Sequence, residues 1–445
     1  MTDITVNFNS ITGKIKPMHA VNNGPYGSRG NSSGHIFEEL GIPYARNHDA
    51  AFSSAYGGEH GVDVVNIFPD FDADENDPAS YDFVLTDVTI RNAFEAGVTP
   101  YYRLGNKIEH AVKKYGTNPP KDFHKWARIC EHIIAHYTEG WADGFKYDMP
   151  YWEIWNEPEC RGGIENDRLC WQGTDEEFFE FYAIAAKHLK SRFPHLRIGG
   201  PAFTWAGEGN GILRPFMEYL RGHDVPLDFL SFHGYTNDPH SFVSEEAYAR
   251  ALLKEYGYEN AETHLNEWNY NVGWYYEDMI RSYRGIRTVK GAAFTAASML
   301  TMQKTSLDLF MYYDARPGTL YNGIFEAGTF DLYPPYYAFF AFNDLHRLGN
   351  ECESVCGDRD VYVGAAKKDD KAAIVLAYYK DAEDLAAKDV RLSVTHSGPM
   401  KVTYKVLDEA HRLDTVRVDY VSGDRTELFL RMEPNSVTEL SFEAV

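Results

Sequence analysis

Two acidic residues of this sequence are embedded in apolar segments in the same way, each directly after an asparagine. Glu157 belongs to "PYWEIWNEPEC", residues 150–160, and Glu267 belongs to "THLNEWNYN", residues 263–271. A buried strand has no structural use for an amide beside a carboxylate, because both groups need partners once they leave water. Two carboxylates that face a common point can cleave a glycosidic bond. One is a neutral acid that protonates the leaving oxygen, and the other is ionised and attacks or activates water.

The elements that would position these residues form a regular alternation. Short apolar segments alternate with amphipathic segments long enough for helices, which predicts parallel strands closed into a (β/α)₈ barrel of the TIM type. An open doubly wound sheet is the competing topology, but no G-x-G-x-x-G turn follows the first strand. The predicted strands cover residues 17–21, 43–46, 98–103, 150–155, 196–201, 227–233, 263–268 and 307–313.

Five helices are predicted between these strands. The helix that follows Thr174 carries Glu177 three residues later, which is a capping box. One helical segment, residues 285–305, is so apolar that we expect it to be buried on two sides. The predicted helices cover residues 122–137, 174–193, 241–257, 285–305 and 334–349.

Catalytic groups of such barrels lie at the carboxyl ends of the strands. Glu157 comes directly after the fourth predicted strand, and Glu267 comes at the end of the seventh. Because these strands lie across the barrel from each other, their end residues can approach one another over its mouth. Proximity of like charges raises the pKa of one carboxyl and so separates the acid from the base.

From about residue 351 the pattern changes from alternating strands and helices to strands joined by polar turns, which predicts a separate β-sandwich. The opening strand has no place in the barrel, so we expect it to pack with that sandwich. The predicted organisation is therefore a strand over residues 1–15, a catalytic barrel over 16–350 and an accessory β-sandwich domain over 351–445.

Several motifs resemble those of clan A glycoside hydrolases, and most of all glycoside hydrolase family 39, which is known for β-xylosidases and α-L-iduronidases. "WEIWNEP" resembles the acid/base segment of the clan, and "LNEWN" resembles its nucleophile segment. "ARNHD", after the second strand, and "SFHGYT", after the sixth, are similar to further motifs of the family. The resemblance covers nearly the whole chain and implies a barrel with a β-sandwich.

The resemblance also implies roles for individual residues. Glu157 would be the general acid/base and Glu267 the nucleophile. Asn156 would hold the sugar hydroxyl next to the anomeric carbon, and His48 would bind other sugar hydroxyls. His233 and Tyr235 would flank the nucleophile, and we include both among the substrate-binding residues.

Two strand ends depart from the family pattern. Arg103 ends the third strand, where it could recognise a sugar carboxylate, pair with Glu109 or hold the catalytic glutamates in place. The eighth strand has tyrosines where the family has a tryptophan. Tyr312 is therefore the predicted stacking residue, with Tyr313 as its alternative.

The composition excludes several classes of partner. The formal net charge of −23, without long Lys/Arg clusters, argues against nucleic acid, and no apolar run approaches the roughly 18 residues of a membrane span. We expect a cytoplasmic protein, because no secretory leader is recognisable and an odd number of cysteines suggests reduced thiols. Cys160 and Cys170 flank one loop and could pair under oxidation. We predict neither a metal nor another cofactor.

The sequence thus predicts a retaining exo-glycosidase that acts on oligosaccharides or glycosides, with a terminal β-D-xylosyl group as the first candidate substrate. Arabinosyl, galactosyl and uronic-acid substrates are the alternatives for the same mechanism. A non-catalytic carbohydrate-binding barrel and a metal-dependent hydrolase that uses His48 and His233 are the alternatives from other classes. Exposed edge strands of the sandwich could pair between subunits, which would allow a homo-oligomer.

Overall fold

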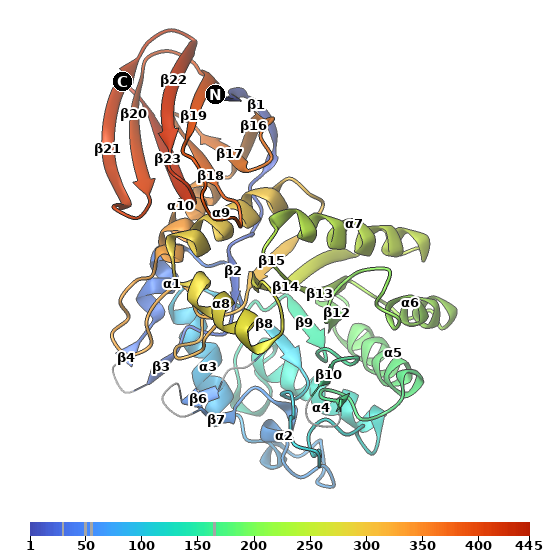
Figure 1. Ribbon diagram of the computed structural model, residues 1–445. Coiled ribbons are helices and arrows are strands. Elements are labelled where there is room, and N and C mark those ends of the chain that lie inside the picture. Colours follow the sequence, from blue (N-terminus) through green and yellow to red (C-terminus); the bar gives the residue numbers. More distant parts are fainter. Residues whose placement is uncertain (29–30, 49–50, 54–56, 163–165) are drawn as a thin grey trace.

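A computed structural model describes residues 1–28, 31–48, 51–53, 57–162 and 166–445 (Figure 1). Eight parallel strands close into a barrel, which confirms the predicted fold class and all eight predicted barrel strands. In chain order, the barrel strands are β2 (Ala20–Asn22), β5 (Tyr44–Arg46), β8 (Thr99–Leu104), β9 (Tyr151–Ile154), β12 (Arg197–Phe203), β13 (Phe229–Thr236), β14 (Glu262–Tyr270) and β15 (Leu309–Tyr312).

The interior of the barrel is filled by side chains rather than by solvent. Tyr101, Phe229 and Met311 belong to a small buried cluster contributed by different strands. Such filling is typical of eight-stranded barrels, in which inward-pointing residues stack in layers. The site must therefore lie at the barrel mouth, beyond these layers. Three short hairpins are formed by β3 (Gly27–Ser28) with β4 (Asn31–Ser32), β6 (Ala51–Ser53) with β7 (Gly57–His60), and β10 (Arg161–Gly162) with β11 (Asp167–Arg168).

The helices surround the barrel, and the helix start that the sequence predicts from its capping residues is confirmed. The Thr174 hydroxyl accepts from the Glu177 amide, and the Glu177 carboxylate accepts from the Thr174 amide, so the predicted capping box is confirmed. The helices are α1 (Gly34–Leu40), α2 (Val64–Ile67), α3 (Val84–Glu95), α4 (Phe123–Thr138), α5 (Asp175–Arg192), α6 (Leu213–Gly222), α7 (Pro239–Glu255), α8 (Tyr276–Ile286), α9 (Val289–Gln303) and α10 (Pro334–Leu348).

The apolar segment predicted as one helix over 285–305 is divided in the structure. Its first residues end α8, and α9 begins after Thr288, whose hydroxyl accepts from the Gly291 amide. The prediction of burial on two sides is confirmed, because nearly every residue of α9 is buried between the barrel and the C-terminal sheet.

The C-terminal part of the chain forms one nine-stranded sheet, ordered β21-β20-β23-β18-β17-β16-β1-β19-β22. The two halves of this sheet face each other over a common core, where Phe8 of β1 meets Phe442 of β23 with ring centroids 5.0 Å apart. This is the sandwich-like domain that the sequence predicts. Its strands are β1 (Thr2–Lys14), β16 (Asn350–Cys356), β17 (Val361–Lys368), β18 (Lys371–Tyr378), β19 (Lys388–Thr395), β20 (Met400–Leu407), β21 (Arg412–Val421), β22 (Arg425–Met432) and β23 (Ser436–Ala444).

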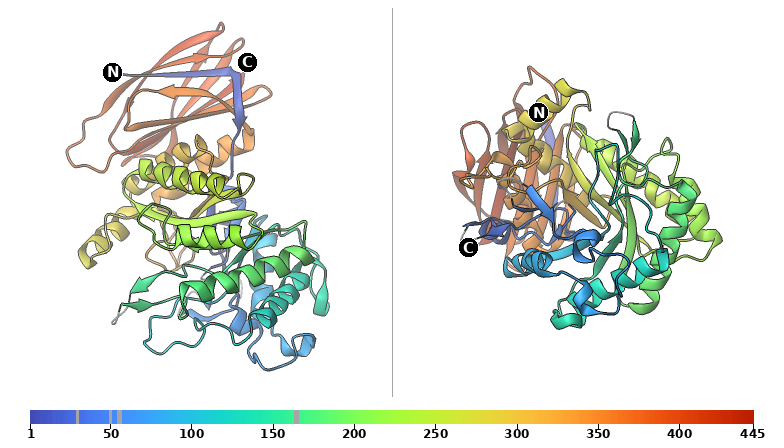
Figure 2. Two further views of the ribbon diagram at one scale, coloured as in Figure 1. Left: turned by 90° about the vertical axis from the view of Figure 1, so that its right-hand side faces the viewer. Right: turned by 90° about the horizontal axis from the view of Figure 1, so that it is seen from below.

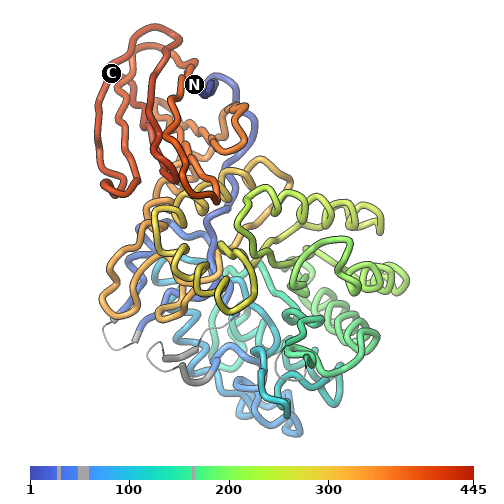
Figure 3. The backbone as a smooth tube through the Cα atoms, viewed as in Figure 1, coloured from blue at the N-terminus to red at the C-terminus, as the bar shows by residue number. Residues whose placement is uncertain are grey.

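The first strand of the chain is an internal strand of this C-terminal sheet. β1 pairs antiparallel with β16 and parallel with β19, and both chain termini lie in the sheet domain (Figures 2 and 3). These pairings support the domain limits 1–15, 16–350 and 351–445, which stay a prediction. Among the described residues, none of the helices combines the length and the apolar character that crossing a bilayer requires.

Candidate active site

A strained turn at the end of β9 directs Glu157 to the barrel mouth. Trp155 and Glu157 have φ angles of 73° and 45°, in the left-handed region that non-glycine residues rarely adopt. The backbone is held there because the Trp155 amide donates to the Leu104 carbonyl and the Glu157 amide donates to the Ala202 carbonyl. Strain of this kind costs roughly 1–3 kcal/mol per residue and persists mainly at functional sites.

Glu267 lies near the carboxyl end of β14, with only 6% of its side chain exposed. Its Oε1 accepts from Arg46 Nη1 at 2.7 Å, and its Oε2 accepts from the Tyr235 hydroxyl at 2.8 Å. Burial raises the pKa of Glu267, and the Arg46 guanidinium and the Tyr235 hydroxyl oppose that shift. Both partners favour the ionised carboxylate, which is the form that a nucleophile requires.

The two glutamates come close together, as the barrel topology predicts. One carboxylate oxygen of Glu157 lies within 4.8 Å of one carboxylate oxygen of Glu267. Retaining glycosidases hold their carboxyl groups about 5–5.5 Å apart, whereas inverting enzymes need about 6.5–9.5 Å to admit a water molecule. The separation therefore fits attack by a carboxylate on the sugar.

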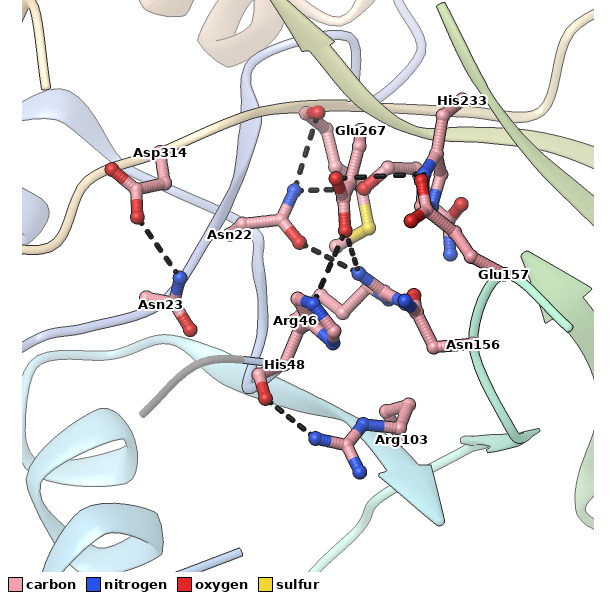
Figure 4. A network of polar contacts seen from close by, with 12 residues as sticks. Asn22, Asn23, Arg46, His48, Arg103, Asn156, Glu157, His233, Glu267 and Asp314 are labelled. Atoms are coloured by element: carbon pink, nitrogen blue, oxygen red, sulfur yellow. Dashed lines mark hydrogen bonds and ion pairs between the residues drawn. The ribbon is translucent and has the colours of Figure 1, made fainter. Parts of the chain in front are cut away.

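Arg46, at the end of β5, organises the base of the site and was not among the predicted site residues (Figure 4). This buried guanidinium donates through Nε to Glu153 at 2.7 Å, through Nη1 to Asn22 and Glu267, and through Nη2 to Asn156 at 2.6 Å. Burial lowers its pKa, but Glu153 and Glu267 outweigh that effect, so the pKa is raised overall. One cation thus fixes both the nucleophile and the amide beside the acid.

His233, on β13, lies between the two carboxylates. Its Nδ1 is 2.7 Å from Glu157 Oε1 and 3.5 Å from Glu267 Oε2. Burial lowers the pKa of this fully buried imidazole to about 4, so the ring is neutral near pH 7. A neutral ring can hydrogen-bond to Glu157 without forming an ion pair with it.

A cavity of about 1070 Å³ opens over the two glutamates. Trp205 and Trp274 are partly exposed at this cavity, and aromatic faces of this kind can stack on sugar rings. Two further carboxylates, Glu159 and Glu245, also line it, and burial raises the pKa of Glu245 to about 8. The remaining lining residues are His48, Ile108, His110, Asn156, Glu157, Cys160, Arg161, Gly162, Thr204, Tyr235, Glu267, Met279, Tyr283, Tyr313 and Tyr321.

Most of the predicted binding residues meet at this cavity. Asn156 and Tyr235 line it, and so does His48, whose Nε2 lies 3.7 Å from Glu267 Oε1. His233 contacts both carboxylates but is not among the residues that line the cavity. The structure brings these residues together, while their individual roles toward a substrate stay predictions.

Two predicted binding residues lie elsewhere. Arg103 is completely buried behind His48, where it donates to the His48 carbonyl at 2.6 Å and to Asp63 at 2.8 Å (Figure 4). It therefore does not face the cavity, and its ion-pair partner is Asp63 rather than the expected Glu109. Asp63 lies 40 residues earlier in the chain, and no local motif links it to Arg103.

Tyr312 is also misplaced in the prediction. Its side chain is 1% exposed and packs between Trp268 and Phe339 on the outer face of the barrel. Side chains alternate along a strand, so the next residue, Tyr313, reaches the cavity instead. The predicted alternative, Tyr313, therefore lines the cavity, and its role as the stacking residue stays a prediction.

A barrel with two opposed glutamates at the carboxyl ends of its fourth and seventh strands defines a glycoside hydrolase. The family model described as glycosyl hydrolases family 39 matches residues 35–351. The chain belongs to this family, as the motifs of the sequence predict, and it is a glycosidase.

Relatives and solved structures agree with this assignment. A β-xylosidase of Geobacillus stearothermophilus is 24% identical over 400 residues, which are 81% of this chain and 72% of that protein. A glucosidase from Croceicoccus marinus superposes with a TM-score of 0.81 at 22% identity, over 100% of this chain and 99% of that one. A monomeric β-xylosidase from Caulobacter crescentus CB15 gives a TM-score of 0.68 at 18% identity, over the full length of both chains. At these identities the structural likeness shows the shared fold.

Proposed function

We propose that this chain is a retaining exo-β-D-xylosidase that releases a terminal xylosyl group from oligosaccharides or glycosides. The observation that carries the proposal is the separation of the two carboxylates, with oxygens within 4.8 Å of each other over a cavity. The family supplies the class of reaction. The curated relative named a β-xylosidase, together with a second one from Caldicellulosiruptor saccharolyticus, supports xylose as the sugar.

The proposed reaction has two steps. Glu267 attacks the anomeric carbon while Glu157 gives its proton to the leaving oxygen, which produces a covalent glycosyl-enzyme. Glu157 then takes a proton from water, and that water releases the sugar with its original configuration. Arg46 and Tyr235 hold Glu267 in position, and they stabilise its carboxylate before the attack and after the sugar is released.

The charges around the cavity bear on the alternative substrates. Four carboxylates line it, those of Glu157, Glu159, Glu245 and Glu267, whereas Arg103 points away from it. The hydroxyl groups of a neutral sugar can hydrogen-bond to these carboxyl groups, whereas Arg161, which also lines the cavity, is the cation that a uronic acid would need. Arabinosyl and galactosyl groups remain the neutral alternatives.

The test uses aryl β-xyloside, α-arabinofuranoside, β-galactoside and β-glucuronide with the wild type, Glu157→Gln and Glu267→Ala. The wild type should prefer the xyloside. Glu267→Ala should lose more than about 10⁴-fold in kcat, and azide should restore turnover with a product of inverted configuration. Normal turnover by Glu267→Ala would contradict the mechanism. Preference for another sugar would change the assigned substrate but not the mechanism. A cytoplasmic location and a homo-oligomer stay predictions from the sequence.

A further inference from the structure

Two cysteines converge on the proposed acid/base residue. Cys160 directly precedes β10, and one residue separates the end of β11 from Cys170, so the hairpin brings the two cysteines together. The Leu169 amide donates to the Cys160 carbonyl at 3.0 Å, which closes the hairpin beside both cysteines. The two Sγ atoms and one carboxylate oxygen of Glu157 all lie within 4.8 Å of one another.

We propose that Glu157, Cys160 and Cys170 form an inhibitory binding site for a thiophilic divalent cation such as Zn²⁺. The inhibition rests on the proposed function, because it requires Glu157 to be the acid/base. Zn²⁺ is bound by cysteine sulfur at about 2.3 Å and by carboxylate oxygen at about 2.0–2.2 Å, so tetrahedral ligand atoms lie roughly 3.8 Å apart. Small side-chain movements bring the three atoms to that spacing, and the fourth position faces the cavity that Cys160 lines.

The cavity gives a cation access to the three ligands. Cys160 is partly exposed at the cavity, which Glu157 also lines. Arg161 lines the cavity as well, but it is exposed to solvent. Glu267 is paired with Arg46, and burial raises the pKa of Glu245 to about 8, so the attraction for a thiophilic cation comes from the two thiols and Glu157 themselves.

The site is compatible with an active enzyme when no metal is bound. Without a cation, His233 Nδ1 lies 2.7 Å from Glu157 Oε1, so the acid is held at the cavity. A bound cation displaces the protons of both thiols and of the Glu157 carboxyl, which all pass to solvent, and it takes the Glu157 oxygen as its third ligand. A metal-bound carboxylate cannot carry the proton that the leaving group needs, so turnover stops.

The experiment separates metal binding from catalysis. Tag-free wild type, Cys170→Ser and Cys356→Ser are titrated with Zn²⁺ by calorimetry and with Co²⁺ by absorption, and xyloside hydrolysis is then measured at each Zn²⁺ concentration. Cys170 is buried outside the cavity, and Cys356 is a partly exposed cysteine of the distant sheet domain. We expect the wild type and Cys356→Ser to bind one Zn²⁺, to show a thiolate-to-cobalt band and to lose activity, which a chelator restores. Cys170→Ser should lose the band and keep its activity.

Equal zinc binding by wild type and Cys170→Ser, or a cobalt complex without the thiolate band, would overturn the site. Binding that depends on Cys170 but leaves hydrolysis unchanged would overturn the inhibition and would also count against Glu157 as the acid. If Cys170→Ser does not fold, Cys160→Ala serves for the binding measurements. Glu157→Gln should weaken Zn²⁺ binding by at least the roughly 10–100-fold that loss of an outer-sphere partner already costs.

Discussion

Arg46 Nη1 lies 2.7 Å from Glu267 Oε1, and both side chains are buried at the base of the cavity. The same guanidinium neutralises Glu153, which is buried deeper in the barrel and also accepts from Ser231 and Asn266. Two buried carboxylates therefore depend on one cation. Arg46 links the stability of the barrel to the position of the nucleophile.

Replacing Arg46 by methionine should damage both properties. Removal of one partner from a buried ion pair costs about 3–5 kcal/mol, because Glu153 and Glu267 would remain buried without their cation. We expect that loss in the free energy of unfolding, together with a fall in kcat of at least about 100-fold. Urea unfolding and xyloside kinetics measure the two effects. Arg197→Met is the control, since Arg197 is half exposed and its surface pair is worth about 0–1 kcal/mol. Equal effects of the two variants would contradict this role of Arg46.

Tyr235→Phe should move the pH profile. The Tyr235 hydroxyl stabilises ionised Glu267, so its removal raises the pKa of this carboxyl and protonates the nucleophile at a higher pH. A hydrogen bond to a charged group is worth about 1.5–3 kcal/mol, so the acid limb of kcat/KM should shift upward by roughly 1 pH unit. Tyr44→Phe, at the opposite end of the barrel, should leave the profile unchanged. An acid limb that stays in place for Tyr235→Phe would show that this hydroxyl does not act on Glu267.

Adjacent tyrosines at the end of β15 should respond differently to substitution. Tyr312→Ala removes a buried aromatic ring and should lower the free energy of unfolding by about 3–5 kcal/mol. Tyr313→Ala removes a cavity wall and should lower kcat/KM roughly tenfold, as expected for the loss of ring stacking, with a much smaller change in stability. Thermal unfolding and xyloside kinetics of both variants test this division. The reverse pattern would restore Tyr312 as the stacking residue.

His19 should make the protein sensitive to acid. Burial, with a smaller contribution from His346, lowers the pKa of His19 from 6.5 to about 3. Between these values the unfolded chain binds a proton that the folded chain does not, so stability falls as pH falls below about 6.5. His19→Gln should therefore reduce the slope of unfolding free energy against pH by about 1.4 kcal/mol per unit between pH 4 and 6. His195→Gln, at an exposed position, is the control. Identical slopes for His19→Gln and the wild type would exclude this contribution.

The barrel and its two glutamates could be predicted because they depend on local pattern and on chain order. Apolar segments mark the strands, and parallel strands place all their carboxyl ends on one side. Asn156 and Glu157 interrupt such a segment with groups that only a site can use.

The remaining differences arise where the outcome depends on contacts between distant residues or on the direction of a side chain. Arg46 contacts residues from several strands, and no spacing in the sequence reveals that convergence. Tyr312 and Tyr313 differ only in the face of the strand from which they project, and a shift of one residue reverses that face. The start of α9 depends on the Thr288 cap, which competes with an equally apolar segment before it.

The position of β1 affects how the protein forms during synthesis. The strand ends at Lys14, and its antiparallel neighbour, β16, begins only at Asn350. At about 5–20 residues per second, the strand waits roughly 20–70 s for that neighbour. Its exposed hydrogen-bonding edge is open to other nascent chains during this interval. Yield in the cell should thus depend on chaperones that shield β1 until the sheet domain is complete.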